Sequence, residues 1–142
     1  MKDKYFIDTN VFLYTFDSDP FKKEIALELI QEALSHQKGI VSYQVLQEFL
    51  NVVLKKFKVP MKIDDCKVYL ETVLFPLCEV FPDQNLFMRA LDLKKKFKFG
   101  FYDAVIVASA LHGGCQILYS EDLQHRQKIE QLMIVNPFER NK

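Results

Sequence analysis

Five short apolar runs alternate with longer amphipathic segments along this chain of 142 residues, and that alternation constrains the fold most. The runs predict buried β-strands at residues 4–8, 39–41, 79–81, 116–119 and 132–135. Parallel strands need long crossover connections, usually helices, which then cover both faces of the sheet. The pattern predicts an α/β fold with three layers (α/β/α) and a short, mostly parallel central sheet of four to five strands.

The segments between these runs have helical periodicity and recognisable ends. We expect a short helix or turn at residues 9–16, then helices from Pro20, from Tyr43 to about Lys58, over 63–75, over 83–97 and over 102–111. Ser42 is expected to cap the Tyr43 helix with its side chain, and Pro76 to end the helix over 63–75. The segment Tyr102–Leu111 is apolar on nearly every side, which predicts a buried helix.

Composition indicates one globular domain over residues 1–142, because apolar residues make up 49% and charged residues 27% of the chain. The three cysteines are odd in number and lack zinc-site spacing, which favours a reduced, cytoplasmic setting. The N-terminus does not resemble a signal peptide, and no apolar stretch is long enough for a membrane span. We therefore expect a soluble protein without a membrane partner.

The formal net charge is zero, with 19 basic and 19 acidic residues. This balance argues against binding nucleic acid by bulk charge alone. It leaves room for a metal-dependent nuclease, because bound cations reverse the field of an acidic pocket.

Four well-separated acidic residues occupy positions where active sites form. Asp8 ends the first predicted strand, and Asp122 follows the strand ending at Tyr119; ligands bind beyond the carboxyl ends of parallel strands. Asp103 lies in the first turn of the apolar helix, where surroundings should be apolar and a carboxylate needs a partner such as a metal ion. Glu48 lies in the first half of the Tyr43 helix.

Each of these residues also has an ordinary structural explanation. Asp8 and Asp103 could cap helices, Asp122 could be a turn residue with Glu121 as its competitor, and Glu48 could be a solvated helical side chain. If all four side chains met at one site, metal-dependent phosphodiester hydrolysis would explain why. Phosphodiester hydrolysis needs an activated water and a stabilised leaving oxygen, and Mg²⁺ or Mn²⁺ held by carboxylates can supply both.

Four segments carry a family resemblance that extends over nearly the whole chain. They are Phe6-Ile7-Asp8-Thr9-Asn10, Gln47-Glu48-Phe49, Tyr102-Asp103-Ala104-Val105-Ile106-Val107-Ala108-Ser109-Ala110 and Leu118-Tyr119-Ser120-Glu121-Asp122-Leu123. In this order and spacing they resemble the PIN-domain family, specifically the VapC-like toxin ribonucleases of bacterial toxin–antitoxin systems.

The resemblance implies a Mg²⁺- or Mn²⁺-dependent endoribonuclease that hydrolyses RNA, forms a homodimer and is inhibited by a cognate antitoxin. It makes Asp8, Glu48, Asp103 and Asp122 the catalytic, metal-binding quartet, with Asp122 either ligating the metal or orienting water. Thr9 and Ser120 match small hydroxyl positions beside the metal, and Asn10 matches a residue that helps hold the first aspartate.

Basic and aromatic residues alternate just before Asp103. Lys94, Lys95, Lys96 and Lys98 are candidate RNA-binding residues, because lysines among aromatics can contact phosphates and stack unpaired bases. Alternatively, these lysines favour the dipole at a helix C-terminus while the aromatics belong to the core. Lys55, Lys56 and Lys58 form a similar cluster.

Three other functions compete with the endoribonuclease. The first is a PIN-like RNA-binding module without catalysis. The second is a Mg²⁺-dependent phosphatase with Asp8 as nucleophile; such enzymes usually carry a second Asp two residues on, where this chain has Asn10. The third is an interaction protein with incidental acidic residues.

Overall fold

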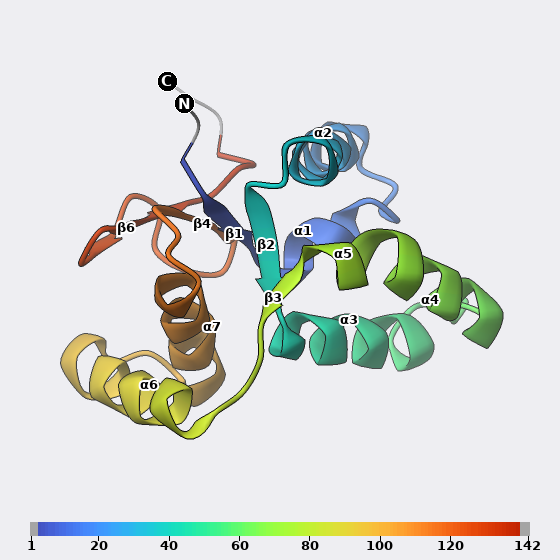
Figure 1. Ribbon diagram of the computed structural model, residues 1–142. Helices are drawn as coiled ribbons and strands as arrows, with labels where there is room; N and C mark the ends of the chain where they lie inside the picture. The colour runs from blue at the N-terminus through green and yellow to red at the C-terminus, as the bar shows by residue number, and fades with distance from the viewer. Residues whose placement is uncertain (1–2, 140–142) are drawn as a thin grey trace.

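The computed structural model describes residues 3–139, which form a six-stranded sheet with helices around it (Figure 1). The strand order is β3-β2-β1-β4-β6-β5, and every neighbouring pair is parallel except β5 and β6. The strands are β1 (Tyr5–Ile7), β2 (Gly39–Ser42), β3 (Cys78–Val80), β4 (Ile117–Tyr119), β5 (Lys128–Ile129) and β6 (Leu132–Val135).

Helices make most of the connections between the strands. They are α1 (Thr9–Tyr14), α2 (Pro20–His36), α3 (Tyr43–Lys55), α4 (Ile63–Tyr69), α5 (Phe75–Leu77), α6 (Gln84–Phe97) and α7 (Phe101–His112). Figure 1 shows α6 and α7 on one side of the sheet and α1 and α2 on the other. Helices α3 and α4 extend together from the sheet, joined by the stacked rings of Phe49 and Tyr69.

The core lies between these layers and includes the strands themselves. Phe6, Ile40, Leu118 and Ile134 are fully buried, as a sheet covered on both faces requires. Helix α7 is buried from Ala104 to Leu111, which confirms the prediction from its all-round apolar surface.

The three-layer, mostly parallel α/β prediction is confirmed, but the sheet has six strands instead of four to five. The additional strand, β5, is only two residues long and pairs antiparallel with β6. Its turn contains Glu130 at φ 54°, a left-handed conformation that is usually taken by Gly or Asn. A strand this short, with no Gly or Asn in its turn, has no sequence pattern to reveal it.

Two predicted helix ends and one predicted capping hydrogen bond differ from the structure. Helix α3 ends at Lys55, not near Lys58, and the Ser42 side chain makes no capping hydrogen bond. Pro76 does not end the helical region; it lies within α5, after a π-helical turn at Leu70–Leu74. In that wider turn the Phe75 amide bonds to the Leu70 carbonyl, so the helix already departs from α geometry where Pro76 follows.

Cys66, Cys78 and Cys115 are free thiols. Between residues 3 and 139, no helix combines the length and apolar character needed to cross a bilayer.

Gly39 allows α2 to approach β2 closely, so we predict that Gly39→Ala destabilises the protein. A Cβ at Gly39 would lie 2.4 Å from Ala33 Cβ and 2.7 Å from a ring carbon of Tyr5. The expected loss of unfolding free energy is about 1–3 kcal/mol, measured by urea denaturation. Gly100→Ala is the matched control, because an added Cβ there meets no atom within 4 Å. Equal stability of both variants would contradict the close approach.

Candidate active site

The site begins where β1 and β4 end side by side. Ile7 pairs with Tyr119 in parallel register, so Asp8 and Ser120 follow at the same edge of the sheet. Ser120 Oγ donates a hydrogen bond to Asp8 Oδ2 (2.8 Å), and the Thr9 amide donates to Asp8 Oδ1 (2.7 Å). Asp8 therefore caps α1 and also faces the edge where a parallel sheet forms a site.

The surroundings of Asp8 oppose its ionisation. Its side chain is buried, and this burial raises the pKa of its carboxyl to about 7 from an ordinary 3.8. The negative charges of Glu48 and Asp122 contribute to this net rise, whereas the hydrogen bonds from Ser120 and Thr9 oppose it. The fold thus holds a carboxyl group at a position that favours its neutral form in the absence of a cation.

Glu48 reaches the site from α3, which packs against α1. Thr9 Oγ1 donates to Glu48 Oε1 (2.7 Å), and Gln44 Nε2 donates to Glu48 Oε2 (3.0 Å). Gln44 Nε2 also donates to the Tyr102 carbonyl at the start of α7 (3.2 Å). Glu48 is half-buried and oriented by two donors, so it is not the solvated helical side chain of the simpler explanation.

Asp103 contributes from the first turn of α7, but its surroundings differ from the prediction. The first three residues of this helix, Phe101, Tyr102 and Asp103, are exposed, so the expected apolar environment of the Asp103 carboxylate is wrong. A helix that is buried along most of its length can still expose its first turn to solvent. Partial desolvation raises the pKa of Asp103, and the charges of Asp122 and Glu48 add to this effect.

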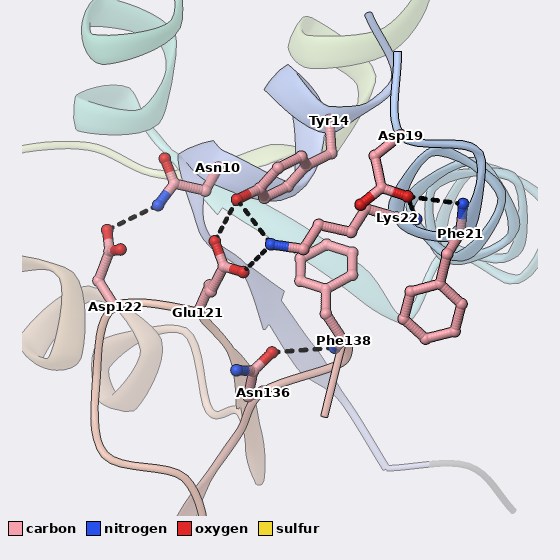
Figure 2. Close-up of polar contacts among 9 residues, drawn as sticks. All are labelled: Asn10, Tyr14, Asp19, Phe21, Lys22, Glu121, Asp122, Asn136 and Phe138. Atoms are coloured by element: carbon pink, nitrogen blue, oxygen red, sulfur yellow. Dashed lines mark hydrogen bonds and ion pairs between the residues drawn. The ribbon is translucent and has the colours of Figure 1, made fainter. Parts of the chain in front are cut away.

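Asp122 and Glu121 follow β4 and turn in different directions, as Figure 2 shows. Glu121 Oε2 forms an ion pair with Lys22 Nζ (2.6 Å), and Glu121 Oε1 accepts a hydrogen bond from the Tyr14 hydroxyl. Asp122 Oδ2 instead accepts from Asn10 Nδ2 (2.6 Å). Glu121 and Asp122 therefore have separate partners, and Asn10 donates to Asp122 instead of to Asp8, the residue that the family resemblance implied.

All four predicted carboxylates line one cleft of about 510 Å³, together with Thr9 and Asn10. They come from four separate segments of the chain, so the tertiary structure creates the cluster. Sequence reasoning missed several other lining residues, which are Leu13, Asn51, Val52, Tyr102 and Ile106. Val52 lies one helical turn after Glu48 on α3, and Ile106 lies one turn after Asp103 on α7, so both share a helix face with a carboxylate.

The predicted lysines lie elsewhere. Lys94, Lys95 and Lys96 are in the last turn of α6 and Lys98 follows it; in the part of the chain that the structure describes, none of the four lines the acidic cleft. Lys94 Nζ donates to the Phe99 carbonyl, which suits the helix-end explanation. Lys56, from the second lysine cluster, does line the cleft and is the one Lys or Arg among its lining residues in the described part of the chain.

The four carboxylates are not arranged with the geometry of a metal-coordination site. Within residues 3–139, no three His, Cys, Asp or Glu side chains are arranged as a group that could hold an ion. Asp8, Glu48 and Asp122 each accept hydrogen bonds from protein groups. Their donor chemistry nevertheless suits a hard cation, because carboxylate oxygens are the ligands that Mg²⁺ and Mn²⁺ prefer.

Comparison with known proteins identifies the fold and the family. The PIN domain family model matches residues 5–130, so this chain belongs to the PIN-domain family, as its four segments predicted. No curated protein sequence matches the chain significantly.

Solved structures of toxin–antitoxin proteins have a similar fold. A toxin–antitoxin complex from Klebsiella pneumoniae matches with a TM-score of 0.66 and 20% identity, covering 94% of this chain and 97% of that one. VapBC-1 from nontypeable Haemophilus influenzae matches with a TM-score of 0.66 and 18% identity, covering 95% of this chain and 98% of that one. The sarcin–ricin-loop-cleaving toxin VapC20 of Mycobacterium tuberculosis matches with a TM-score of 0.60 and 18% identity. The match covers 83% of this chain and 89% of that one.

The raised pKa of Asp8 leads to a prediction about stability without metal. A carboxyl whose pKa is about 7 when folded and about 3.8 when unfolded stabilises the fold only while protonated. This stabilisation is complete below pH 4 and is lost as the pH rises to 7. In EDTA at pH 7.5, Asp8→Asn should therefore be more stable than wild type, by at most about 4 kcal/mol.

Urea denaturation at pH 4 and pH 7.5 measures this difference. The advantage of Asp8→Asn should nearly vanish at pH 4, where wild-type Asp8 is protonated. Asp92→Asn, which replaces an exposed carboxylate on α6, should match wild type at both pH values. A less stable Asp8→Asn at pH 7.5 would mean that the capping hydrogen bonds outweigh the repulsion.

Proposed function

We propose that this chain, as one PIN-like domain over residues 1–142, is a metal-dependent endoribonuclease and the toxin of a toxin–antitoxin pair. The observation that carries the proposal is the convergence of Asp8, Glu48, Asp103 and Asp122 on one cleft beyond β1 and β4. Burial and, to a smaller extent, the charges of the neighbouring carboxylates raise the pKa of Asp8 and Asp103, so the metal-free cleft disfavours their negative charge. A divalent cation is the ligand that compensates this charge.

The chain's residues divide into those that hold the ion and those that hold its ligands. We assign Asp8 and Asp103 as direct ligands, Glu48 as the third, and Asp122 as a fourth ligand or as the residue that orients water. Ser120 and Thr9 fix the orientations of Asp8 and Glu48, and Asn10 fixes Asp122. A bound Mg²⁺ or Mn²⁺ would activate water and stabilise the leaving oxygen of the phosphodiester.

RNA is the proposed substrate, and a protein inhibitor is the proposed partner. VapC20 is named for cleaving an RNA loop, and other proteins of this fold were solved as toxin–antitoxin complexes. Lys56 at the cleft supplies a cation for phosphate, while the neutral total charge predicts modest, salt-sensitive affinity. We also propose a cytoplasmic homodimer; the exposed Met88 and Leu91 on α6 offer apolar surface for such a contact.

The alternatives fit the site less well. For a phosphatase, Asp8 would have to act as the nucleophile with a second acid two residues on. The residue two positions on, Asn10, donates to Asp122 and provides no second acid. A non-catalytic RNA-binding module would gain nothing from four carboxylates, because they repel phosphate unless a cation is bound.

The cleavage prediction is that wild type degrades mixed RNA with Mn²⁺ or Mg²⁺ and that EDTA abolishes this. Asp8→Asn and Asp103→Asn should each lower the rate by more than about 100-fold, beyond the loss typical of groups that only support a ligand. Asp122→Asn should retain more activity. Gel analysis of labelled RNA gives the rates.

Asp92→Asn, purified in parallel, controls for contaminating ribonucleases and should cleave like wild type. Equal cleavage by wild type and Asp8→Asn would refute the mechanism. If Asp122→Asn were more damaging than Asp103→Asn, the assignment of direct ligands would be wrong.

Metal binding can be tested without activity. Saturating Mn²⁺ should raise the melting temperature of wild type, because an ion at 100 times its Kd stabilises the fold by about 2.7 kcal/mol. At about 2–4 °C per kcal/mol, the shift is easily measured by calorimetry. Asp92→Asn should show the same shift and Asp8→Asn almost none. A shift in Asp8→Asn as large as in wild type would place the metal elsewhere.

The toxin role needs a separate observation. A small neighbouring gene whose DNA-binding product inhibits the cleavage would distinguish a toxin from a housekeeping nuclease.

A further inference from the structure

A second, mainly apolar pocket of about 280 Å³ adjoins the acidic cleft. It lies between the end of β2, the start of α3 and the α6–α7 pair, and Tyr102 lines both this pocket and the cleft. Its walls include Val80, Leu86 and Val105. None of the four carboxylates lines it, so the proposed metal chemistry leaves this pocket without a role.

Two buried polar atoms in the pocket wall lack hydrogen-bond partners. They are Ser42 Oγ and Gln44 Oε1, the only such side-chain atoms among the described residues. Ser42 is 2% exposed, and its hydroxyl does not cap α3. Gln44 Nε2 donates to Glu48 and to the Tyr102 carbonyl, so the amide orientation is set and its oxygen remains an acceptor. Buried unpaired polar groups are costly, and a ligand that pairs with them recovers that cost.

Exposed aromatic rings surround these atoms. Tyr43, Phe101 and Tyr102 line the pocket with 42%, 38% and 68% of their surfaces exposed. Aromatic side chains that remain open to solvent next to a phosphodiesterase cleft can stack on unpaired bases. The pocket therefore combines a stacking surface, a hydroxyl group and an acceptor.

We propose that this pocket binds one unpaired nucleobase of the RNA, next to the phosphodiester in the acidic cleft. The proposal rests on the proposed function for its substrate class. A base N–H group donates to Gln44 Oε1, the base edge pairs with Ser42 Oγ, and the ring stacks against the aromatic side chains. Because Gln44 also holds Glu48, occupancy of the pocket constrains the orientation of a carboxylate in the cleft.

A flat heterocycle matches the pocket better than a protein segment does. The volume is slightly below the ~300 Å³ at which pockets for drug-sized ligands begin, which suits a one- or two-ring base. A purely apolar helix face would cover Ser42 Oγ and Gln44 Oε1 without pairing them. A nucleobase edge carries donors and acceptors in the plane of an aromatic ring, so it can satisfy both atoms and also stack.

The test uses uncharged nucleosides in EDTA, so that neither cleavage nor repulsion by the acidic cleft interferes. Adenosine, guanosine, cytidine and uridine are titrated into the full chain, with ribose as the control without a base. Amide chemical shifts report binding, and at least one nucleoside should shift the Ser42, Gln44 and Tyr102 signals at millimolar concentration. Ribose should not.

Two pocket variants and two matched controls give the result its specificity. Ser42→Ala should weaken nucleoside binding about 3- to 10-fold while leaving the melting temperature unchanged or higher, because it removes an unpaired buried hydroxyl. Tyr43→Ala should weaken binding at least about 5-fold through lost stacking. Ser35→Ala on α2 and Phe75→Ala on α5 replace exposed residues outside the pocket and should bind like wild type.

Equal shifts with ribose and nucleosides, or full nucleoside binding by both pocket variants, would overturn the proposal. So would a wild-type dimer, detected by light scattering, that binds no nucleoside and dissociates in Tyr43→Ala, because the pocket would then be a protein interface. Nucleoside binding that persists in Asp8→Asn supports the pocket even if wild type cleaves no RNA. RNA cleavage without nucleoside binding would refute only the pocket.

Discussion

The parallel pairing of β1 with β4 is the interaction on which the rest of the site depends. It joins two segments far apart in the sequence and brings Asp8 and Ser120 to the same edge of the sheet. Helices α1 and α3 then build on that edge, since Thr9 begins α1 and holds Glu48 of α3. Any shift of register between β1 and β4 would separate Asp8 from its hydroxyl partner and from the other carboxylates.

The same convergence opposes folding and favours cation binding. Asp8 is buried among other acidic groups, and its raised pKa measures how poorly the metal-free fold accommodates its charge. The hydrogen bonds from Ser120 and the Thr9 amide offset this cost only in part. Carboxyl groups with strongly perturbed pKa values cluster at functional sites.

Helix α3 connects the acidic cleft with the apolar pocket that we propose binds a nucleobase. Glu48 faces the cleft, Tyr43 lines the pocket, and Gln44 lies between them with hydrogen bonds to Glu48 and to the start of α7. Under the two proposals, α3 would carry a metal-binding carboxylate and a base-binding side chain on adjacent turns. This arrangement gives a near-neutral chain a route to selectivity that does not rely on bulk positive charge.

Local sequence patterns predicted the layered α/β architecture and the buried helix α7, because periodicity is a property of short segments. The four acidic residues were proposed from a family resemblance and, for Asp8 and Asp122, also from their positions after strands. Local patterns could not reveal β5, whose turn lacks the usual residues, or the exposure of Asp103 at the open end of α7. Contacts between distant segments decided the rest: Glu121 pairs with Lys22, which leaves Asp122 to the cleft, and Asn10 holds Asp122 instead of Asp8. Ser42 was expected to cap a helix, and only the packing of β2 against α7 made its hydroxyl an unpaired group in a pocket.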